Sequence, residues 1–208
     1  MAQIISLSLI KGGVGKSTTT LNLAFNLFQN EKKVLVIDID PQANLTKALQ
    51  VNPEKQEYSI VEVLLNPKRG VGDAIVKTTT GLDLVSSRMN LVQAEVELND
   101  KMYREALLAI ALEDTKKQYD YILIDTPPSF NVLSKNALVA ADFVIIPTQV
   151  EQDSYEAIEQ TLRSIDIVRE QANEELKIAG ILCTTVYRIE LANELKPWQK
   201  KRVVHPEG

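Results

Sequence analysis

The residues best suited to chemistry lie near the start of the chain, where positions 10–18 read Ile-Lys-Gly-Gly-Val-Gly-Lys-Ser-Thr. Glycines allow consecutive backbone N–H groups to turn toward phosphate oxygens, and a helix that begins directly behind them adds a partial positive charge. In that setting the Lys16 ammonium would neutralise the outer phosphates, and the Ser17 hydroxyl would bind Mg²⁺. The run follows apolar residues and precedes an amphipathic segment, which is the strand–loop–helix setting of a phosphate-binding loop. We therefore expect the chain to bind a nucleoside triphosphate.

This loop departs from the general pattern G-x-x-x-x-G-K-[ST] at its first position. Ile10 stands where the pattern has a glycine, and a second lysine, Lys11, comes directly before Gly12 and Gly13. Lys11 is either a solvated charge at the end of a strand or a residue with a second task, because Lys16 already serves the phosphates. In the second interpretation Lys11 would reach a phosphate bound by a neighbouring subunit.

Carboxylates follow two further apolar runs. Asp38 and Asp40 alternate after the run at 33–37, so both would project to one side of an extended segment that Pro41 stiffens. They form either a polar turn or, beside a phosphate loop, groups that position the attacking water or hold Mg²⁺ through water. Asp125 ends the apolar run at 121–124, as in a Walker B strand, and would hold a water of the Mg²⁺ shell.

Two turns complete the candidate site. Thr126, Pro127 and Pro128 form a stiff turn after Asp125 that would sense the γ-phosphate. The apolar run at 143–146 leads into residues 147–151, Pro-Thr-Gln-Val-Glu. That segment is either a plain strand-to-helix loop or a loop that faces a partner subunit.

Short apolar runs alternate with helical patterns, which predicts an α/β fold with a mostly parallel, twisted sheet and helices on both faces. We expect strands at residues 3–9, 33–37, 82–85, 121–124, 143–146 and 178–184. We expect helices at 16–29, 59–65, 89–98, 102–117 and 154–171, with Ser59 and Glu62 at the spacing of a capping box. Ligands in such sheets bind at the carboxyl ends of strands, so the loop and the carboxylates should meet there.

Length and composition fit one α/β domain, with 208 residues of which 45% are hydrophobic and 25% charged. The net charge of −5 argues against a protein that is basic throughout, but not against a local basic patch for nucleic acid. Cys183 is the single cysteine, so we expect no internal disulfide, a cytoplasmic location and a buried thiol. No apolar run approaches the ~20 residues that span a bilayer.

Together these motifs resemble the ParA family of partition ATPases, within the larger group that includes MinD. The resemblance covers residues 3 to about 190 and is carried by residues 11–18, 38–42, 125–128 and 147–149. The sequence Asp-Ile-Asp-Pro-Gln at 38–42 is more similar to the partition branch than to MinD. The resemblance implies a single P-loop ATPase domain of the deviant Walker A type over residues 1–208.

The resemblance also implies roles for individual residues in a dimer that encloses two molecules of ATP with Mg²⁺. Lys11 would cross to the nucleotide of the other subunit, Asp40 would be the carboxylate needed for hydrolysis, and Asp38 would be a switch residue near the metal. The implied catalytic residues are Lys11, Lys16 and Asp40, and the implied metal residues are Ser17 and Asp125. The residues expected to contact the nucleotide are Lys11, Gly12, Gly13, Val14, Gly15, Lys16, Ser17, Thr18, Asp38 and Pro127.

The implied partners are DNA and a second protein. The ATP-dependent homodimer would bind DNA without sequence preference and associate with the nucleoid, and a ParB-type adaptor would stimulate slow hydrolysis while a plasmid, chromosome region or other cargo is positioned. Non-specific affinity depends steeply on the number of phosphates neutralised, so doubling a basic patch on dimerisation would switch DNA binding on. The alternatives are a membrane-associated positioning ATPase similar to MinD and a truncated nucleotide-binding module with little turnover.

The sequence departs from the family pattern at its end. Family members normally continue with a helix, a strand and a closing helix, which help to complete the adenine pocket and the DNA-binding face. Here a basic tail at residues 190–208 stands in their place, with Lys196, Lys200, Lys201 and Arg202. The tail is too short and too broken by proline for an amphipathic membrane helix, so we expect no membrane association.

Overall fold

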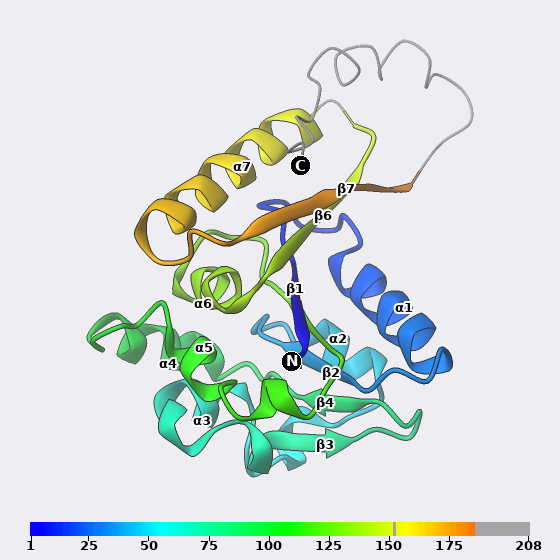
Figure 1. Cartoon of the computed structure of the whole chain (residues 1–208), viewed down its shortest axis with the longest axis vertical. Helices are drawn as coiled ribbons and strands as arrows, with labels where there is room; N and C mark the ends of the chain where they lie inside the picture. Colours follow the sequence, from blue (N-terminus) through cyan, green and yellow to red (C-terminus); the bar gives the residue numbers. More distant parts are fainter. Residues whose placement is uncertain (152, 186–208) are drawn as a thin grey trace.

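A seven-stranded sheet forms the centre of the computed structural model, which describes residues 1–151 and 153–185 (Figure 1). The strands are β1 (Gln3–Leu7), β2 (Val34–Asp38), β3 (Ile75–Lys77), β4 (Asp83–Val85), β5 (Tyr121–Asp125), β6 (Phe143–Gln149) and β7 (Lys177–Thr185). Their order is β3-β4-β2-β5-β1-β6-β7, and in this part of the chain only the edge pair β3–β4 is antiparallel. The expected α/β fold with a mostly parallel sheet is therefore confirmed.

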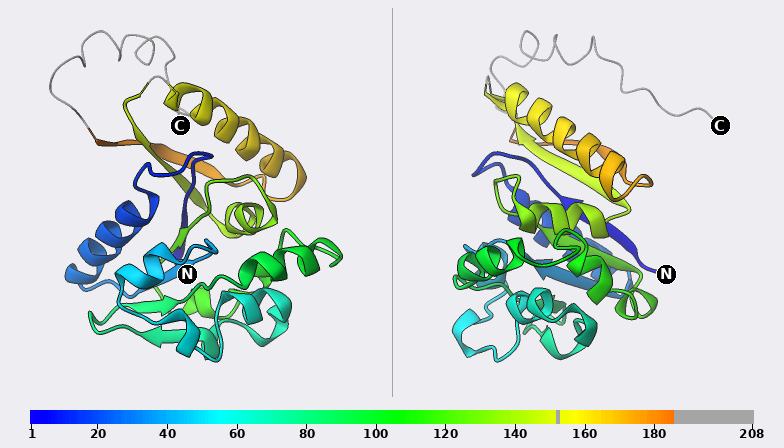
Figure 2. Two further views of the ribbon diagram at one scale, coloured as in Figure 1. Left: turned by 180° about the vertical axis from the view of Figure 1, so that it is seen from behind. Right: turned by 90° about the vertical axis from the view of Figure 1, so that its left-hand side faces the viewer.

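Helices cover both faces of the sheet (Figure 2). One face packs against α1 (Lys16–Gln29) and α2 (Asn44–Ala48). The other packs against α3 (Ile60–Leu65), α4 (Leu91–Asn99), α5 (Leu107–Ala111), α6 (Val132–Ala140) and α7 (Ser154–Gln171). Short 3₁₀ turns lie at Pro53–Lys55, Pro67–Arg69, Gly72–Ala74 and Thr115–Lys117.

The buried residues of β2 show why this sequence forms a central strand. Val34 and Val36 pack on the α1 side, whereas Leu35 and Ile37 pack on the opposite side. Side chains alternate between the faces of a strand, so a strand covered on both faces must be apolar throughout. The continuous apolar run at 33–37 is explained by this double burial.

The prediction of a helix at 102–117 is wrong over most of that range. The structure has a turn at 101–106, the five-residue helix α5 and a 3₁₀ turn at Thr115–Lys117. Tyr103 adopts a left-handed conformation with φ 56°, which interrupts a helix. The Asn136 side chain also donates to the Arg104 carbonyl at 2.6 Å and accepts from the Leu108 N–H at 2.9 Å, so tertiary contacts fix the turn.

Three elements were not predicted, namely α2, α6 and β3. α2 and β3 have only five and three residues. α6 is buried on most sides, so it lacks the polar face whose period identifies a helix in a sequence. The predicted helix at 59–65 is confirmed with its capping box, in which Ser59 and Glu62 bond reciprocally.

The thiol of Cys183 is exposed, so the expectation of a buried cysteine is wrong. Ile181 and Leu182 beside it are also exposed, because β7 is the outermost described strand at this edge of the sheet. None of the described helices is long and apolar enough to cross a membrane. The tail predicted at 190–208 lies outside the described residues.

Candidate nucleotide-binding site

The carboxyl ends of β1, β5 and β2 lie side by side and hold the predicted site. Leu7 at the end of β1 pairs in register with Asp125 at the end of β5. Asp125 pairs in turn with Asp38 at the end of β2. The parallel register therefore places the glycine loop and both carboxylates at one edge of the sheet, where such folds bind ligands.

The backbone of the loop between β1 and α1 is shaped by glycines. Gly13 and Gly15 have φ angles of 74° and 88°, a conformation that strongly favours glycine. A Cβ added to Gly12 or Gly13 would meet no atom within 4 Å, so open space lies before the loop. Gly15 is the N-cap of α1 and provides no side-chain cap, which leaves the first N–H groups of the helix for an anion.

Lys16 extends back beneath the loop and is buried. Its ammonium donates to the Leu9 carbonyl at 3.1 Å and to the Lys11 carbonyl at 2.8 Å. Burial lowers the pKa of Lys16, although the charges of Asp125 and Asp40 oppose this effect. Because both of these acceptors are uncharged, the ammonium has no hydrogen-bonded counterion in the part of the chain that the structure describes, and it suits a polyphosphate.

Asp125 is a buried carboxylate without an ordinary partner. It is 1% exposed, and neither of its oxygens accepts a hydrogen bond from residues 1–151 or 153–185. Ser17 lies near enough to lower the pKa of Asp125, but burial and the charge of Asp38 dominate and raise it to about 8. An unpaired buried carboxylate is costly, so this position fits a cation or its bound waters.

Asp38 is held by α2, a contact that the sequence did not reveal. One oxygen accepts from the N–H of Thr46 at 2.8 Å and from its hydroxyl at 2.7 Å, and the other accepts from the Asp40 N–H at 3.1 Å. Burial raises the pKa of Asp38 to about 6, while the bonds from Thr46 oppose that shift. The Thr46 hydroxyl also accepts from the Ser87 N–H at 3.0 Å, which links the segment after β4 to this carboxylate.

Asp40 lies at the start of the turn that follows β2. Its carboxylate accepts from the Gln42 N–H at 2.9 Å, and the residue is 8% exposed. This local bond fixes the direction of the carboxylate at the same sheet edge as the glycine loop. The structure thus brings Asp40 close enough to Lys16 and Asp125 for their charges to interact.

Lys11 lies on the outer side of the loop. Its ammonium forms a salt bridge with Glu151 at 2.9 Å and lies 3.4 Å from the Ser154 hydroxyl. The Lys11 side chain is 23% exposed and that of Glu151 is 52% exposed, so the pair is accessible to solvent. In this structure Lys11 is therefore engaged within its own chain.

Residues 147–151 are more than a plain loop, because β6 continues through Gln149 instead of ending near residue 146. The Gln149 side chain donates to the Gly13 carbonyl at 3.1 Å. Thr184 on β7 donates to the Val14 carbonyl at 2.8 Å and lies 3.1 Å from the Thr148 carbonyl. These side chains support the glycine loop. The sequence indicated such a role only through their positions near the ends of predicted strands.

The remaining residues predicted for the site differ in whether their side chains are accessible to a ligand. The side chain of Val14 is buried in the core, so only its backbone can contact a ligand. Pro127 is buried and Thr18 is exposed. The Thr126 hydroxyl donates to the Leu7 carbonyl at 2.8 Å, which ties the turn after β5 to β1.

A cavity of about 720 Å³ lies beside the loop, within the range of small-molecule sites. Its lining includes Gly13, Gly15, Thr18, Gln149, Leu182 and Cys183. A second cavity of about 430 Å³ lies at the opposite, amino-terminal edge of the sheet beside Phe28, Lys77 and Tyr119. Of these two cavities, only the first adjoins the phosphate loop.

Nothing in residues 1–151 and 153–185 forms a cluster of three or more His, Cys, Asp or Glu side chains that could hold a metal. Mg²⁺ commonly takes one or two carboxylates together with waters and substrate phosphates. The hydroxyl of Ser17 and the unpartnered carboxylate of Asp125 match that donor set.

The raised pKa of Asp125 predicts a pH-dependent stability in the absence of nucleotide. The folded protein retains a proton that the unfolded chain has already released, so the free energy of unfolding should fall as pH rises from about 4 to 8. One such group gives a slope approaching about 1.4 kcal/mol per pH unit. Urea unfolding of the wild type and Asp125→Asn at pH 5.5, 6.5 and 7.5 checks this. Parallel pH profiles for the two proteins would contradict it.

The glycine loop, its lysine and the carboxylate at the end of the adjacent strand define a P-loop nucleoside triphosphatase. The profile of the AAA domain family matches residues 2–178. The sporulation initiation inhibitor protein Soj of Bacillus subtilis is 38% identical over 98% of this chain and 82% of its own. The chromosome partitioning protein ParA of Myxococcus xanthus is 41% identical over 88% of this chain and 65% of its own.

A solved structure has a similar fold. Cobyrinic acid a,c-diamide synthase from Mycobacterium smegmatis, solved with a bound ATP analog and magnesium, has a TM-score of 0.84 and 36% sequence identity over 88% of this chain and 75% of its own. The chain belongs to the ParA family of partition ATPases.

Proposed function

We propose that this chain is a partitioning ATPase that dimerises on binding ATP and Mg²⁺, binds DNA without sequence preference and releases it after hydrolysis. The observation that carries the proposal is the buried carboxylate of Asp125, which accepts no hydrogen bond from the described residues, beside a glycine loop whose lysine donates to backbone carbonyls. That arrangement suits a magnesium-bound triphosphate. The relatives Soj and ParA support the partition branch over a membrane-associated ATPase of the MinD type.

The residues of this site would bind the phosphates, hold Mg²⁺ and orient the attacking water. The N–H groups of residues 12–18 and the ammonium of Lys16 would hold the phosphates, with the base in the adjacent 720 Å³ cavity. Ser17 and Asp125 would hold Mg²⁺, which neutralises negative charge on the phosphate oxygens. Asp40 would orient the attacking water, and the turn at Thr126 and Pro127 would sense the γ-phosphate.

Dimerisation would depend on Lys11. To reach the nucleotide of a second subunit, this lysine must exchange its salt bridge with Glu151 for a contact with phosphate. Contacts from both subunits to the γ-phosphate would stabilise the dimer, and hydrolysis would remove them. The protein would thus act on the nucleoid in the cytoplasm, with a ParB-type adaptor accelerating a slow reaction. We also propose that residues 1–208 form one ATPase domain that ends in the basic tail at 190–208.

Cosedimentation with DNA in the presence of ATP, ADP or no nucleotide tests this function. We expect retention only with ATP, and loss of retention when salt is raised, because binding to phosphates releases counterions. Lys16→Ala should abolish retention, whereas Lys55→Ala, which changes an exposed lysine in the 3₁₀ turn Pro53–Lys55, should not. Equal retention with ATP and ADP would refute the nucleotide-controlled binding.

A further inference from the structure

Asp38 is a buried carboxylate to which the proposed hydrolysis assigns no role. It is fully buried, and from the described residues its two oxygens accept three hydrogen bonds, two from Thr46 and one from the Asp40 N–H. All three donors belong to the segment that directly follows β2. Hydrogen bonds of this kind stabilise a buried charge, so they would have to break before the carboxylate could turn to a ligand.

The bonds from Thr46 take the place of a cap at the start of α2. The N-cap residue of this helix is Ala43, which has a left-handed conformation with φ 53° and no side-chain acceptor. The Thr46 N–H, in the first turn, donates to the Asp38 carboxylate at 2.8 Å instead. Because an acceptor at this place satisfies an N–H group that has no partner within the helix, Asp38 fixes the start of α2 against the end of β2.

The third bond fixes the backbone of Asp40, the residue proposed to orient the attacking water. The Asp40 N–H donates to Asp38 at 3.1 Å, and the Asp40 carbonyl accepts from the Ala43 N–H at 2.9 Å. In the Asp40 carboxylate, Oδ1 accepts from the Gln42 N–H, so Oδ2 is the oxygen that would receive the water. A misplacement of about 1 Å can cost roughly 10²-fold in rate, so the bond from Asp38 bears directly on hydrolysis.

The Thr46 hydroxyl is held from two sides, which sets its direction. It accepts from the Ser87 N–H at 3.0 Å and lies 2.7 Å from the Asp38 carboxylate. A backbone N–H can only donate and an ionised carboxylate can only accept, so the hydroxyl proton must point to Asp38.

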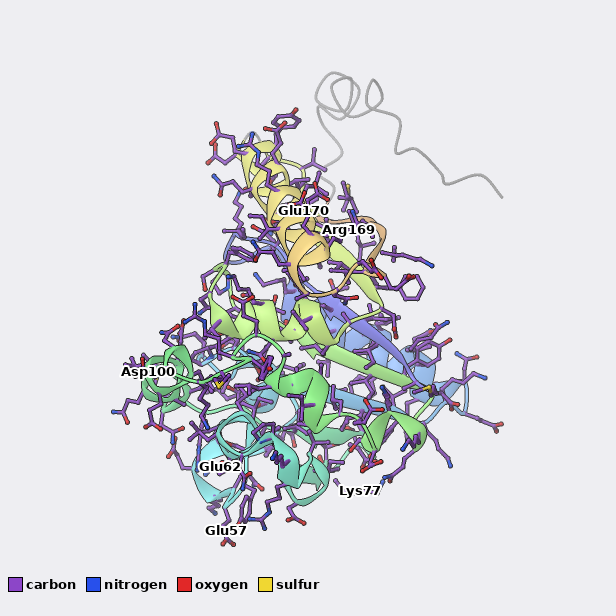
Figure 3. All side chains as sticks on the ribbon, turned by 60° about the vertical axis from the view of Figure 1, so that its left-hand side comes forward. Glu57, Glu62, Lys77, Asp100, Arg169 and Glu170 are labelled. Atoms are coloured by element: carbon purple, nitrogen blue, oxygen red, sulfur yellow. The ribbon has the colours of Figure 1, made fainter. Side chains whose placement is uncertain are left out.

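The segment that carries Ser87 is itself anchored to α3. The carbonyl of Ser86 accepts from the Ile60 N–H at 2.9 Å, and Arg88 forms a salt bridge with Glu62. Figure 3 shows Glu62 on α3, in the lower part of the molecule. The support of Asp38 therefore extends from the site into the body of the fold.

We propose that Asp38 and Thr46 are positioning residues for ATP hydrolysis: Thr46 holds the Asp38 carboxylate, and that carboxylate fixes Asp40 without itself contacting nucleotide or Mg²⁺. This role rests on the proposed function, because it requires Asp40 to orient the attacking water. It differs from the role that the resemblance implies, in which Asp38 contacts the nucleotide.

Turnover and affinity separate a positioning role from direct contact with the ligand. We expect Asp38→Ala and Asp38→Asn to lower kcat about tenfold or more, and to bind a non-hydrolysable ATP analogue with Mg²⁺ within about threefold of the wild type. Phosphate release and calorimetric titration measure the two quantities. A folded variant, as judged by circular dichroism, that bound the analogue about tenfold or more weakly would overturn the proposal.

The double variant Asp38→Ala with Asp40→Ala tests whether Asp38 acts through Asp40. We expect it to hydrolyse ATP within about twofold of the rate of Asp40→Ala alone, because the group that Asp38 positions is already absent. A further loss of about tenfold or more would reveal an independent effect of Asp38 and overturn the proposal.

Two substitutions of Thr46 test the hydroxyl. Thr46→Ser keeps it and should hydrolyse ATP within about threefold of the wild type, whereas Thr46→Val should lower kcat about tenfold without weakening analogue binding. Thr78→Val is the matched control, because Thr78 is also buried and its hydroxyl donates to the Leu82 carbonyl between β3 and β4. It should retain the wild-type rate. Equal rates for Thr46→Ser and Thr46→Val would overturn the proposal, and this comparison alone decides if the Asp38 variants do not fold.

DNA retention measures the proposed function separately. If the wild type hydrolysed ATP but was not retained on DNA with ATP, the DNA-binding function would fail and the roles of Asp38 and Thr46 in hydrolysis would stand. If retention followed ATP as expected but Asp38→Ala and Thr46→Val turned over at the wild-type rate, only the positioning role would fail.

Discussion

Asp40→Ala is expected to reduce the rate of ATP hydrolysis by roughly 10²–10⁴-fold, the usual contribution of a positioned acid–base group. Asp40 is held at the sheet edge by its bond from the Gln42 N–H, and the hydrogen bonds of the Lys16 ammonium go to the Leu9 and Lys11 carbonyls and not to Asp40. Removing the carboxylate should therefore leave nucleotide affinity nearly unchanged. Phosphate release and calorimetric titration with a non-hydrolysable ATP analogue measure the two quantities separately.

Asp166→Ala provides the control for this variant, because Asp166 is a surface residue of α7 paired with Arg169. It should hydrolyse ATP at the wild-type rate. Asp40→Ala should also be retained on DNA more strongly than the wild type in the presence of ATP, since the bound state is no longer consumed. Hydrolysis within twofold of the wild type would rule out the proposed role of Asp40.

Lys11→Ala is expected to retain most of its nucleotide affinity and to lose ATP-dependent dimerisation. Within one chain the Lys11 side chain contacts Glu151 and Ser154, whereas the phosphate lysine Lys16 has its own acceptors. The backbone carbonyl of Lys11 that receives Lys16 is present in the alanine variant. Light scattering of both proteins with a non-hydrolysable ATP analogue gives the oligomeric state directly.

Glu151→Gln supplies the complementary test. It removes the charged partner of Lys11 within the chain, so dimerisation should persist or strengthen. Loss of the dimer in Glu151→Gln with retention in Lys11→Ala would be the reverse of the expected pattern and would assign the crossing contact to another residue.

The parts of the site that follow from local sequence patterns could be predicted from the sequence. The glycine loop and the carboxylates Asp38 and Asp125 each follow an apolar run, and a parallel sheet brings the ends of such runs together. The observed register, with Leu7, Asp125 and Asp38 in line on β1, β5 and β2, follows from that rule.

The supporting residues could not be predicted because their roles depend on contacts between distant segments. Thr184 bonds to the Val14 carbonyl across 170 residues, and Thr46, which holds Asp38, accepts from the Ser87 N–H across 41. The prediction of a helix at 102–117 was wrong for the same reason, because a distant residue, Asn136 on α6, fixes the turn through the Arg104 carbonyl. A single sequence does not indicate which distant partner a threonine or asparagine will find.

The setting of Lys16 has a practical consequence for affinity measurements. Among the described residues, its ammonium donates to the carbonyl oxygens of Leu9 and Lys11 and to no carboxylate. Before nucleotide binds, sulfate or inorganic phosphate in the solution will therefore compete for this cation and the glycine N–H groups beside it. Dissociation constants for ATP obtained in phosphate buffer will exceed those obtained in a zwitterionic buffer with chloride as the only anion.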